Sequence, residues 1–278
     1  MILDSEVIEH AIDEAVREDV GRGDLTSIAL IPEDAQYSGT VRARQDMVVA
    51  GLGIAERVFE ILAPTANVKI LLEDGVQVTP GTDLAKISGP ARDLLTAERT
   101  ALNFLQHLSG IATLTRAYVD EINGTGAVLL DTRKTIPGLR LLAKYATSMG
   151  GAKNHRLRLD DGVLIKDNHL SVAGGVAEAV ARARKAGLTD IEVECDTLDQ
   201  VRQSIEAGAD SVLLDNMPPP VLVEAVAIVA GRIKTEASGG VTLKTIHAIA
   251  ETGVDYISVG RITQSAPAID IGLDWDSD

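Results

Sequence analysis

Basic side chains are concentrated between residues 130 and 170 of a chain whose formal net charge is −15. They include Arg133, Lys134, Lys144, Lys153, His155, Arg156, Arg158 and Lys166. Guanidinium and ammonium groups form charge-assisted hydrogen bonds with carboxylate and phosphate oxygens. The residue types in this segment therefore predict a site for an anionic ligand.

Polar residues follow six apolar segments that we predict to be strands, at 127–131, 162–166, 190–194, 211–215, 232–236 and 255–259. The carboxyl ends of parallel strands lie on one rim of an α/β sheet or barrel, and ligands bind there. One charged strand end is common in a solvated loop, but polar groups at six successive ends favour a binding site.

The residue types at these strand ends change along the chain. The early strands end in Arg133, Lys134 and Lys166, whereas the middle strands end in Glu194 and Asp215, which suit a hydrated magnesium ion bridging to a pyrophosphate. The late strands end in small residues, whose backbone N–H groups can approach a phosphate closely. These small residues are Ser238, Gly239, Gly240 and Gly260. The pattern predicts a substrate that carries at least one phosphate.

Helical patterns at 139–148, 171–187, 198–208, 219–230 and 242–252 alternate with these strands. This alternation predicts βαβ units and a parallel sheet, closed or nearly closed into a barrel. Earlier in the chain we predict helices at 4–18 and 54–62, and strands at 37–44, 47–50, 68–72 and 83–87. These elements predict a small α+β domain with an open antiparallel sheet. A long helix at 91–122, kinked near Ser109 and Gly110, follows it.

Composition limits the classes of protein and partner. The chain has 278 residues, enough for two domains, and its negative charge argues against nucleic acid or an anionic membrane as a partner. The single cysteine, Cys195, excludes an intrachain disulfide and fits a reducing compartment, so we expect a cytoplasmic protein with Cys195 buried. The acidic, aromatic-poor composition also favours adaptation to high salt, although an ordinary acidic protein remains the alternative.

Several segments together resemble the quinolinate phosphoribosyltransferase family, also called nicotinate-nucleotide pyrophosphorylase (carboxylating). The segments are GRGDLTS near the start, AERTALNFLQHLSGIAT at 97–113, DTRKTIPGLRLLAKYA at 131–146, GGAKNHRLRLDDGVLIKDNH at 150–169, EVE at 192–194, LLDN at 213–216 and EASGG at 236–240. The resemblance implies an α/β fold: an incomplete (β/α) TIM-like barrel at 91–265 and a small N-terminal α+β open-faced sandwich at 1–90. The tail at 266–278, with Trp275, is expected to pack on the small domain.

The resemblance also implies the reaction and the residues that perform it. Quinolinate and phosphoribosyl pyrophosphate would give nicotinate mononucleotide, pyrophosphate and CO2 in de novo NAD biosynthesis, with Mg2+. The family pattern implies a homodimer or hexamer of dimers in which Arg99 reaches the neighbouring site. The residues implied to be catalytic are Lys134, Lys166, Glu194 and Asp215, the last two also near the metal. Those implied to bind substrate are Arg99, Thr132, Arg133, Lys134, His155, Arg156, Lys166, Glu194, Asp215, Ser238, Gly239, Gly240, Gly260 and Arg261.

The chain departs from the family after its last strand. The family pattern is Gly-Ala-Leu-Thr-His-Ser, whereas this chain has Gly260-Arg261-Ile262-Thr263-Gln264-Ser265. Arg261 either contacts the phosphate or faces solvent. Other readings stay open: a nicotinate phosphoribosyltransferase without decarboxylation, a phosphosugar aldolase in which Lys166 forms a Schiff base, and a non-enzymatic phosphosugar-binding barrel.

Overall fold

The computed structural model describes residues 4–276, and internal contacts divide the chain into two compact units. The first unit contains the chain up to Arg116, Thr135–Gly151 and the segment from Ile262 onward. The second unit contains Ala117–Lys134 and Ala152–Arg261. Residues 1–3 and 277–278, which the predicted first domain and tail include, lie outside the described part.

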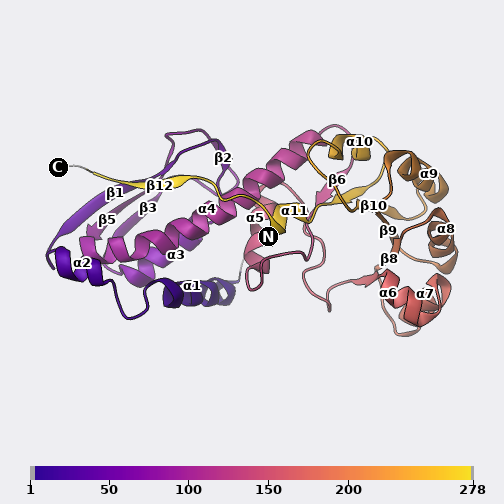
Figure 1. Cartoon of the computed structure of the whole chain (residues 1–278), viewed down its shortest axis with the longest axis horizontal. Coiled ribbons are helices and arrows are strands. Elements are labelled where there is room, and N and C mark those ends of the chain that lie inside the picture. Colours follow the sequence, from indigo (N-terminus) through magenta and orange to yellow (C-terminus); the bar gives the residue numbers. More distant parts are fainter. Residues whose placement is uncertain (1–3, 277–278) are drawn as a thin grey trace. The chain divides into compact units, whose positions relative to one another are not determined.

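The first unit is built on a four-stranded antiparallel sheet with the order β12-β1-β5-β3 (Figure 1). Its strands are β1 (Gln36–Ala43), β3 (Asn67–Ile70), β5 (Asp83–Pro90) and β12 (Ile271–Trp275). A two-stranded sheet joins β2 (Met47–Val48) to β4 (Gln77–Val78). The helices of this unit are α1 (Ser5–Asp19), α2 (Leu25–Leu30), α3 (Leu52–Leu62) and α5 (Arg140–Met149), with α4 (Ala91–Glu121) as far as Arg116.

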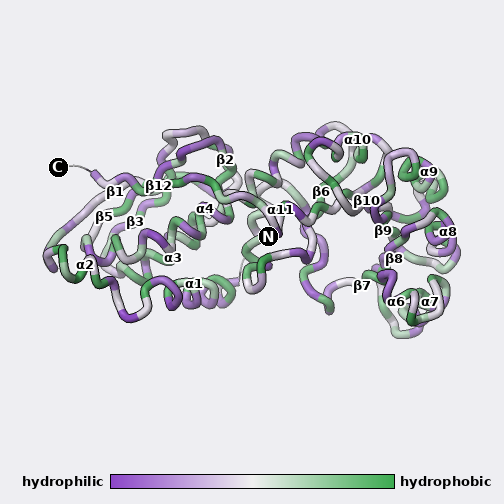
Figure 2. The backbone as a smooth tube through the Cα atoms, in the orientation of Figure 1, coloured by the Kyte–Doolittle hydropathy of each residue, from purple (hydrophilic) through white to green (hydrophobic). Residues whose placement is uncertain are grey.

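A single apolar core explains why α4 and α5 group with this small sheet. Buried residues of α4, such as Leu94 and Leu105, share one cluster with Val41 of β1 and Ala143 of α5. The predicted boundary at residue 90 lies at the start of α4, but the apolar face of that helix is buried in the same core as the sheet. Figure 2 shows the alternation of hydrophobic and hydrophilic residues along these helices that this one-sided burial requires.

The second unit holds six parallel strands in the order β6-β11-β10-β9-β8-β7, as the alternating pattern predicts. They are β6 (Val128–Leu130), β7 (Val163–Ile165), β8 (Ile191–Cys195), β9 (Ser211–Asp215), β10 (Lys234–Ser238) and β11 (Tyr256–Ser258). In the described chain β6 and β7 form no ladder with each other, so the sheet is open at those edges and the barrel is incomplete.

Helices cover the outer side of this sheet (Figure 1). They are α6 (Asp167–Ala173), α7 (Val176–Lys185), α8 (Leu198–Ala207), α9 (Pro219–Val229) and α10 (Ile246–Ala250). The short α11 (Arg261–Gln264) begins at the last residue of this unit and otherwise belongs to the first. The strands are apolar at their centres, where Val193, Val212 and Ile257 are fully buried. No helix in the described chain combines the length and apolar character that crossing a membrane requires.

Local backbone chemistry accounts for several differences from the predicted elements. The segment at 171–187 is interrupted between α6 and α7 because Gly174 and Gly175 adopt φ of 95° and 112°. Helix α4 continues through Gly110, where a Cβ would lie 2.1 Å from the carbonyl oxygen of Pro267. That glycine therefore permits close packing and does not end the helix. Helix α2 was not predicted, although Asp24 caps it by accepting from the N–H groups of residues 26 and 27.

The C-terminal segment completes the antiparallel sheet of the first unit. Strand β12 pairs with β1, with Gly39 opposite Trp275, and the rings of Trp275 and Tyr37 lie 4.7 Å apart between centroids. Asp274 also forms ion pairs with Arg42 and Arg44 of the neighbouring segment. The described part of the tail thus packs against the small sheet.

Candidate active site

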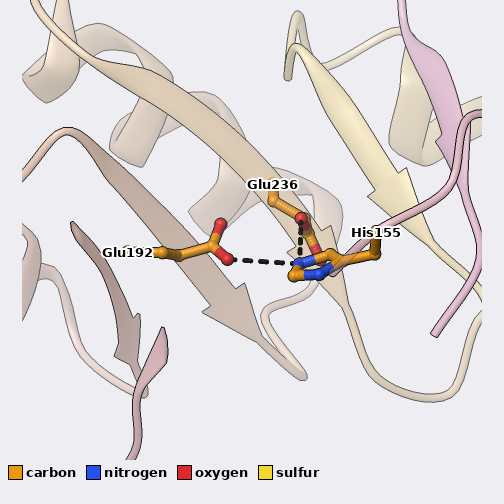
Figure 3. Close-up of side chains that lie close together, drawn as sticks. All are labelled: His155, Glu192 and Glu236. Carbon is orange, nitrogen blue, oxygen red and sulfur yellow. Dashed lines mark hydrogen bonds and ion pairs between the residues drawn. The ribbon is translucent and has the colours of Figure 1, made fainter. Parts of the chain in front are cut away.

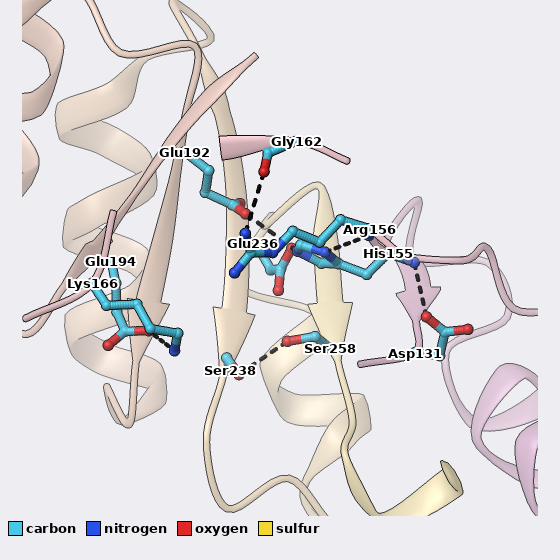
Figure 4. Close-up of polar contacts among 10 residues, drawn as sticks. All are labelled: Asp131, His155, Arg156, Gly162, Lys166, Glu192, Glu194, Glu236, Ser238 and Ser258. Carbon is cyan, nitrogen blue, oxygen red and sulfur yellow. Dashed lines mark hydrogen bonds and ion pairs between the residues drawn. The ribbon is translucent and has the colours of Figure 1, made fainter. Parts of the chain in front are cut away.

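A cavity of about 290 Å³ lies at the carboxyl ends of the parallel strands. Basic, acidic and hydroxyl side chains from all six strand ends or the loops that follow them converge on it. Figure 4 shows several of them, including His155, Lys166 and Glu236. The lining residues are Thr132, Arg133, Lys134, His155, Arg156, Leu164, Lys166, Glu194, Leu213, Asp215, Glu236, Ser238 and Ser258. The convergence follows from the parallel sheet, because every strand delivers its carboxyl end to the same rim.

Two larger cavities lie in the first unit but have a different chemical character. One, of about 900 Å³, is lined by neutral groups including Tyr37 and Trp275, with Asp276 as its charged member among the described residues. The other, of about 650 Å³, is lined by residues of α1, α4 and the segment 137–139, and its charged side chains are three carboxylates and one arginine, with two histidines. Neither offers the several cations that an anionic ligand requires.

Asp131, at the end of β6, holds the turn that carries His155 and Arg156. Its side chain is fully buried, and it accepts hydrogen bonds from Asn154 Nδ2 at 2.6 Å and from the backbone N–H of His155 at 2.8 Å. Lys153 forms an isolated parallel bridge to Leu130, which places this turn directly beside β6. A buried carboxylate that is hydrogen-bonded in this way is a rigid anchor for the side chains that follow.

His155, Glu192 and Glu236 form a compact group, which we call the histidine–glutamate cluster (Figure 3). His155 Nε2 lies 3.2 Å from Glu192 Oε2 and 3.3 Å from Glu236 Oε2. Nδ1 accepts the backbone N–H of Arg156 at 2.7 Å, which assigns a ring proton to Nε2. Both ring nitrogens are therefore engaged within the chain.

Burial and the neighbouring carboxylates act on the pKa of His155 in opposite directions. Burial alone would lower this pKa, but the hydrogen bonds that His155 donates to Glu192 and Glu236 raise it to about 10. Burial also raises the pKa of Glu192, because removing a carboxylate from water disfavours its charged form. Both shifts favour the protonated forms of His155 and Glu192.

Arg133 and Arg156 bring two guanidinium groups to the same cavity. Burial lowers the pKa of Arg156, and the charge of Arg133 lowers it further, which shows that the two cations are close. Arg156 Nη1 also donates to the carbonyl oxygen of Gly162 at 3.2 Å, and this contact orients the guanidinium. Two adjacent cations repel each other unless an anion lies between them, so this side of the cavity is preorganised for a carboxylate or phosphate.

The opposite side of the cavity carries an acidic pair and a lysine. Lys166 Nζ donates to Glu194 Oε2 at 2.7 Å, and Glu194 is the less exposed partner, at 12% against 46% for the side chain of Lys166. Burial raises the pKa of Asp215, and the nearby charge of Glu194 raises it further. The two carboxylates thus destabilise each other's negative charge, a condition that a bound cation would relieve.

Small residues line the end of the cavity formed by β10 and β11. Ser258 Oγ donates to Ser238 Oγ at 2.9 Å, and Ser238 lies opposite Asp215 in the sheet register. The next residue, Gly239, has φ of 93°, and a Cβ there would lie 2.2 Å from Asn216 Oδ1. Only glycine permits this close approach of the two strand-end loops.

Most of the predicted site residues line this one cavity. They are Thr132, Arg133, Lys134, His155, Arg156, Lys166, Glu194, Asp215 and Ser238. Four other predicted residues follow the ends of β10 and β11 but, in the described chain, do not line the cavity: Gly239, Gly240, Gly260 and Arg261. Arg261 is exposed and lies near Tyr118. Burial raises the pKa of Tyr118, and the positive charge of Arg261 acts against this rise. Arg99 is exposed on α4, in the first unit.

Four functional candidates were not singled out from the sequence: Asp131, Glu192, Glu236 and Ser258. For Glu192 a signal exists, because side chains two residues apart in a strand share a face, so Glu192 points to the same side as Glu194. Glu236 lies in an otherwise buried strand, where an acidic residue is unusual without a partner. The partner itself, His155, lies too far away in the sequence to be recognised from it.

Comparisons with known proteins agree with this geometry. The family model of the quinolinate phosphoribosyl transferase N-terminal domain matches residues 24–109, and that of the C-terminal domain matches residues 111–274. A chloroplastic nicotinate-nucleotide pyrophosphorylase (carboxylating) from Oryza sativa subsp. japonica is 41% identical over 292 aligned positions, covering 98% of this chain and 78% of the relative. A probable enzyme of the same name from Bacillus subtilis is 42% identical over 259 positions, covering 92% of this chain and 89% of the relative.

A solved structure of a related protein has the same fold as this chain. The nicotinate-nucleotide pyrophosphorylase from Francisella tularensis superposes with a TM-score of 0.95 at 40% identity and covers 99% of this chain and 98% of its own. Two family models together extend over nearly the whole sequence, and the relatives share about two residues in five with it. The chain therefore belongs to the quinolinate phosphoribosyltransferase family.

Proposed function

We propose that this protein transfers the phosphoribosyl group of phosphoribosyl pyrophosphate to quinolinate and decarboxylates the product to nicotinate mononucleotide, in NAD biosynthesis. The observation that carries this proposal is the cavity of about 290 Å³ that two guanidinium groups and an acidic pair line together. Quinolinate has two adjacent carboxylates, and the cations bind it, whereas the acidic pair suits a ribose and its metal-bound pyrophosphate.

Each part of the cavity has a role in this reaction. Arg133 and Arg156 bind the quinolinate carboxylates, because a planar guanidinium pairs with two oxygens at once. Lys134 and Lys166 neutralise the leaving pyrophosphate. Glu194 complements the positive charge that develops on the ribose as the pyrophosphate leaves. The ordered strand ends keep the two substrates in register, which can contribute roughly 7–11 kcal/mol to lowering the barrier.

Glu194 and Asp215 fit the magnesium ion that phosphoribosyl pyrophosphate brings. Both offer carboxylate oxygens to the same cavity, and their mutual repulsion would be relieved by a divalent cation. When bound, the ion neutralises the pyrophosphate and makes it a better leaving group. The protein's own contribution is to hold the two carboxylates at neighbouring strand ends, β8 and β9.

The cavity is less suited to an aldolase in which Lys166 forms a Schiff base. Such a lysine must lose its proton to act as a nucleophile, usually through a lowered pKa. Lys166 instead donates to Glu194 at 2.7 Å, a contact that stabilises the charged ammonium form. The ion pair suits electrostatic binding of an anion better than covalent attack.

The test is a direct assay of product formation. The purified protein is incubated with quinolinate, phosphoribosyl pyrophosphate and magnesium, and nicotinate mononucleotide and CO2 are measured. A parallel reaction replaces quinolinate with nicotinate. Product from quinolinate supports the proposal, whereas product from nicotinate alone identifies the non-decarboxylating phosphoribosyltransferase. Borohydride trapping of a carbonyl substrate would identify the aldolase.

We also propose a cytoplasmic homodimer, or a larger assembly of dimers, in which Arg99 contacts quinolinate in the neighbouring subunit. Its exposed position on α4 and its place in the family segment at 97–113 support this assignment. The net charge of −15 supports adaptation to high salt, because a dense negative surface keeps a protein soluble there.

A further inference from the structure

One buried oxygen in the cavity has no assigned partner. Glu236 is 2% exposed and lines the cavity, and its Oε2 lies 3.3 Å from His155 Nε2. Its other oxygen, Oε1, is buried and has no hydrogen-bond partner in the described part of the chain. Leaving a buried carboxylate oxygen unsatisfied costs free energy, so a proton or a ligand is expected there.

The proposed reaction requires a proton that the residues named so far do not supply. When the ribosylated pyridine ring loses its neighbouring carboxylate as CO2, the electron pair of the broken carbon–carbon bond remains on C2. That carbanion must become a C–H bond. Arg133 and Arg156 are fixed cations, Lys166 Nζ is held by Glu194 at 2.7 Å, and Lys134 is assigned to the leaving pyrophosphate. The proton source is therefore open.

We infer that Glu236, held in place by His155, is the general acid that protonates C2 after decarboxylation. This inference rests on the proposed function and deepens it. Glu236 combines the two properties that the role requires. It lines the same cavity as the carboxylate-binding arginines, and its buried Oε1, which has no hydrogen-bond partner among the described residues, can carry a proton.

The step balances as follows. The bond from C2 to its carboxylate carbon breaks and CO2 leaves with no electrons from that bond. C2 then takes the proton from Glu236 Oε1, and Glu236 becomes a carboxylate. After CO2 leaves, a water molecule that enters the cavity returns a proton to Glu236 Oε1, and His155 keeps its proton on Nε2 throughout. Each turnover consumes one proton from solvent, and no oxidant or reductant is needed.

Glu192 provides a matched comparison for Glu236. Both are buried glutamates whose Oε2 lies 3.2–3.3 Å from His155 Nε2, but Glu236 lines the cavity and Glu192 does not do so in the described chain. If the two glutamates only hold the imidazole, Glu192→Gln and Glu236→Gln have the same effect. If Glu236 delivers the proton, its replacement alone changes the chemistry at C2.

The decisive measurement is the hydrogen isotope at C2 of the product. The full-length protein and its variants react with quinolinate and phosphoribosyl pyrophosphate in an equal mixture of H2O and D2O, and the H/D ratio at C2 is read by mass spectrometry. A carboxylic acid and bulk water discriminate differently between the two isotopes. We expect the ratio for Glu236→Gln to differ from that of the wild type and of Glu192→Gln, with kcat lowered about 100-fold.

Pyrophosphate release separates this inference from the proposed function. Glu236→Gln is expected to keep a wild-type burst of pyrophosphate, which shows that it folds and transfers the phosphoribosyl group, while nicotinate mononucleotide forms slowly. An unchanged H/D ratio with kcat within about twofold of wild type overturns the assignment of Glu236 and leaves the reaction intact. Failure of the wild type to form any mononucleotide from quinolinate overturns the proposed function itself.

Discussion

Replacing Arg156 with lysine tests how the cavity recognises its anionic substrate. A guanidinium has five N–H donors in a fixed plane, and Arg156 uses one of them on the carbonyl oxygen of Gly162 at 3.2 Å. The others remain for the substrate. A lysine keeps the positive charge, but its N–H donors all lie on one nitrogen. It therefore cannot bind the carbonyl of Gly162 and both oxygens of a carboxylate at the same time.

The expected magnitude follows from the loss of one charged hydrogen bond. Such a bond contributes about 1.5–3 kcal/mol. Since 1.4 kcal/mol corresponds to a factor of ten in an equilibrium constant, the KM for quinolinate should rise about 10- to 100-fold in Arg156→Lys. The KM for phosphoribosyl pyrophosphate should stay within about threefold, because the acidic pair and Lys166 lie on the other side of the cavity.

Arg158→Lys is the matched control. Arg158 lies two residues further on in the same loop, its side chain is 73% exposed, and it pairs with Asp160 at 3.4 Å outside the cavity. Steady-state kinetics with each substrate varied in turn should show wild-type constants for this variant. Equal increases in both KM values for Arg156→Lys, or equal effects of the two variants on quinolinate, would refute carboxylate recognition by Arg156.

Four further predictions concern assembly, the strand-end loop, the thiol and salt. Mixing inactive Arg99→Ala and Lys134→Ala chains should restore activity in verified mixed dimers if sites are shared, and no recovery would show that each site is self-contained. Gly239→Ala should lower stability by about 1–3 kcal/mol in thermal unfolding, and more than Gly240→Ala, where a Cβ meets nothing within 4 Å. Burial raises the pKa of Cys195 to about 11, so less thiolate is present at pH 8. Alkylation of Cys195 should therefore be on the order of 100-fold slower in the folded than in the unfolded protein, and equal rates would contradict its burial. Raising KCl to molar concentrations should increase the melting temperature, and a fall in solubility would count against adaptation to salt.

The secondary structure of the second unit was predictable because its signals are local. Most strands contain a short apolar run and most helices have an amphipathic period, so the βαβ alternation can be read residue by residue, although β10 carries Glu236 at its centre. The same local reading missed α2, whose single turn and a half is defined by the cap at Asp24, and it joined α6 to α7 across Gly174. Short elements depend on caps and turns that a search for periodicity overlooks.

The sequence by itself determined which residues stand at the ends of the strands, and hence the cations, acids and small residues that meet at the cavity. Only the tertiary structure decided which of them touch. Strand order in a parallel sheet depends on contacts between distant segments, and this order brings Glu192 of β8 and Glu236 of β10 to within hydrogen-bonding reach of His155. A buried acid in a strand is visible in the sequence, but its partner is selected by sheet order and register, which no local pattern encodes.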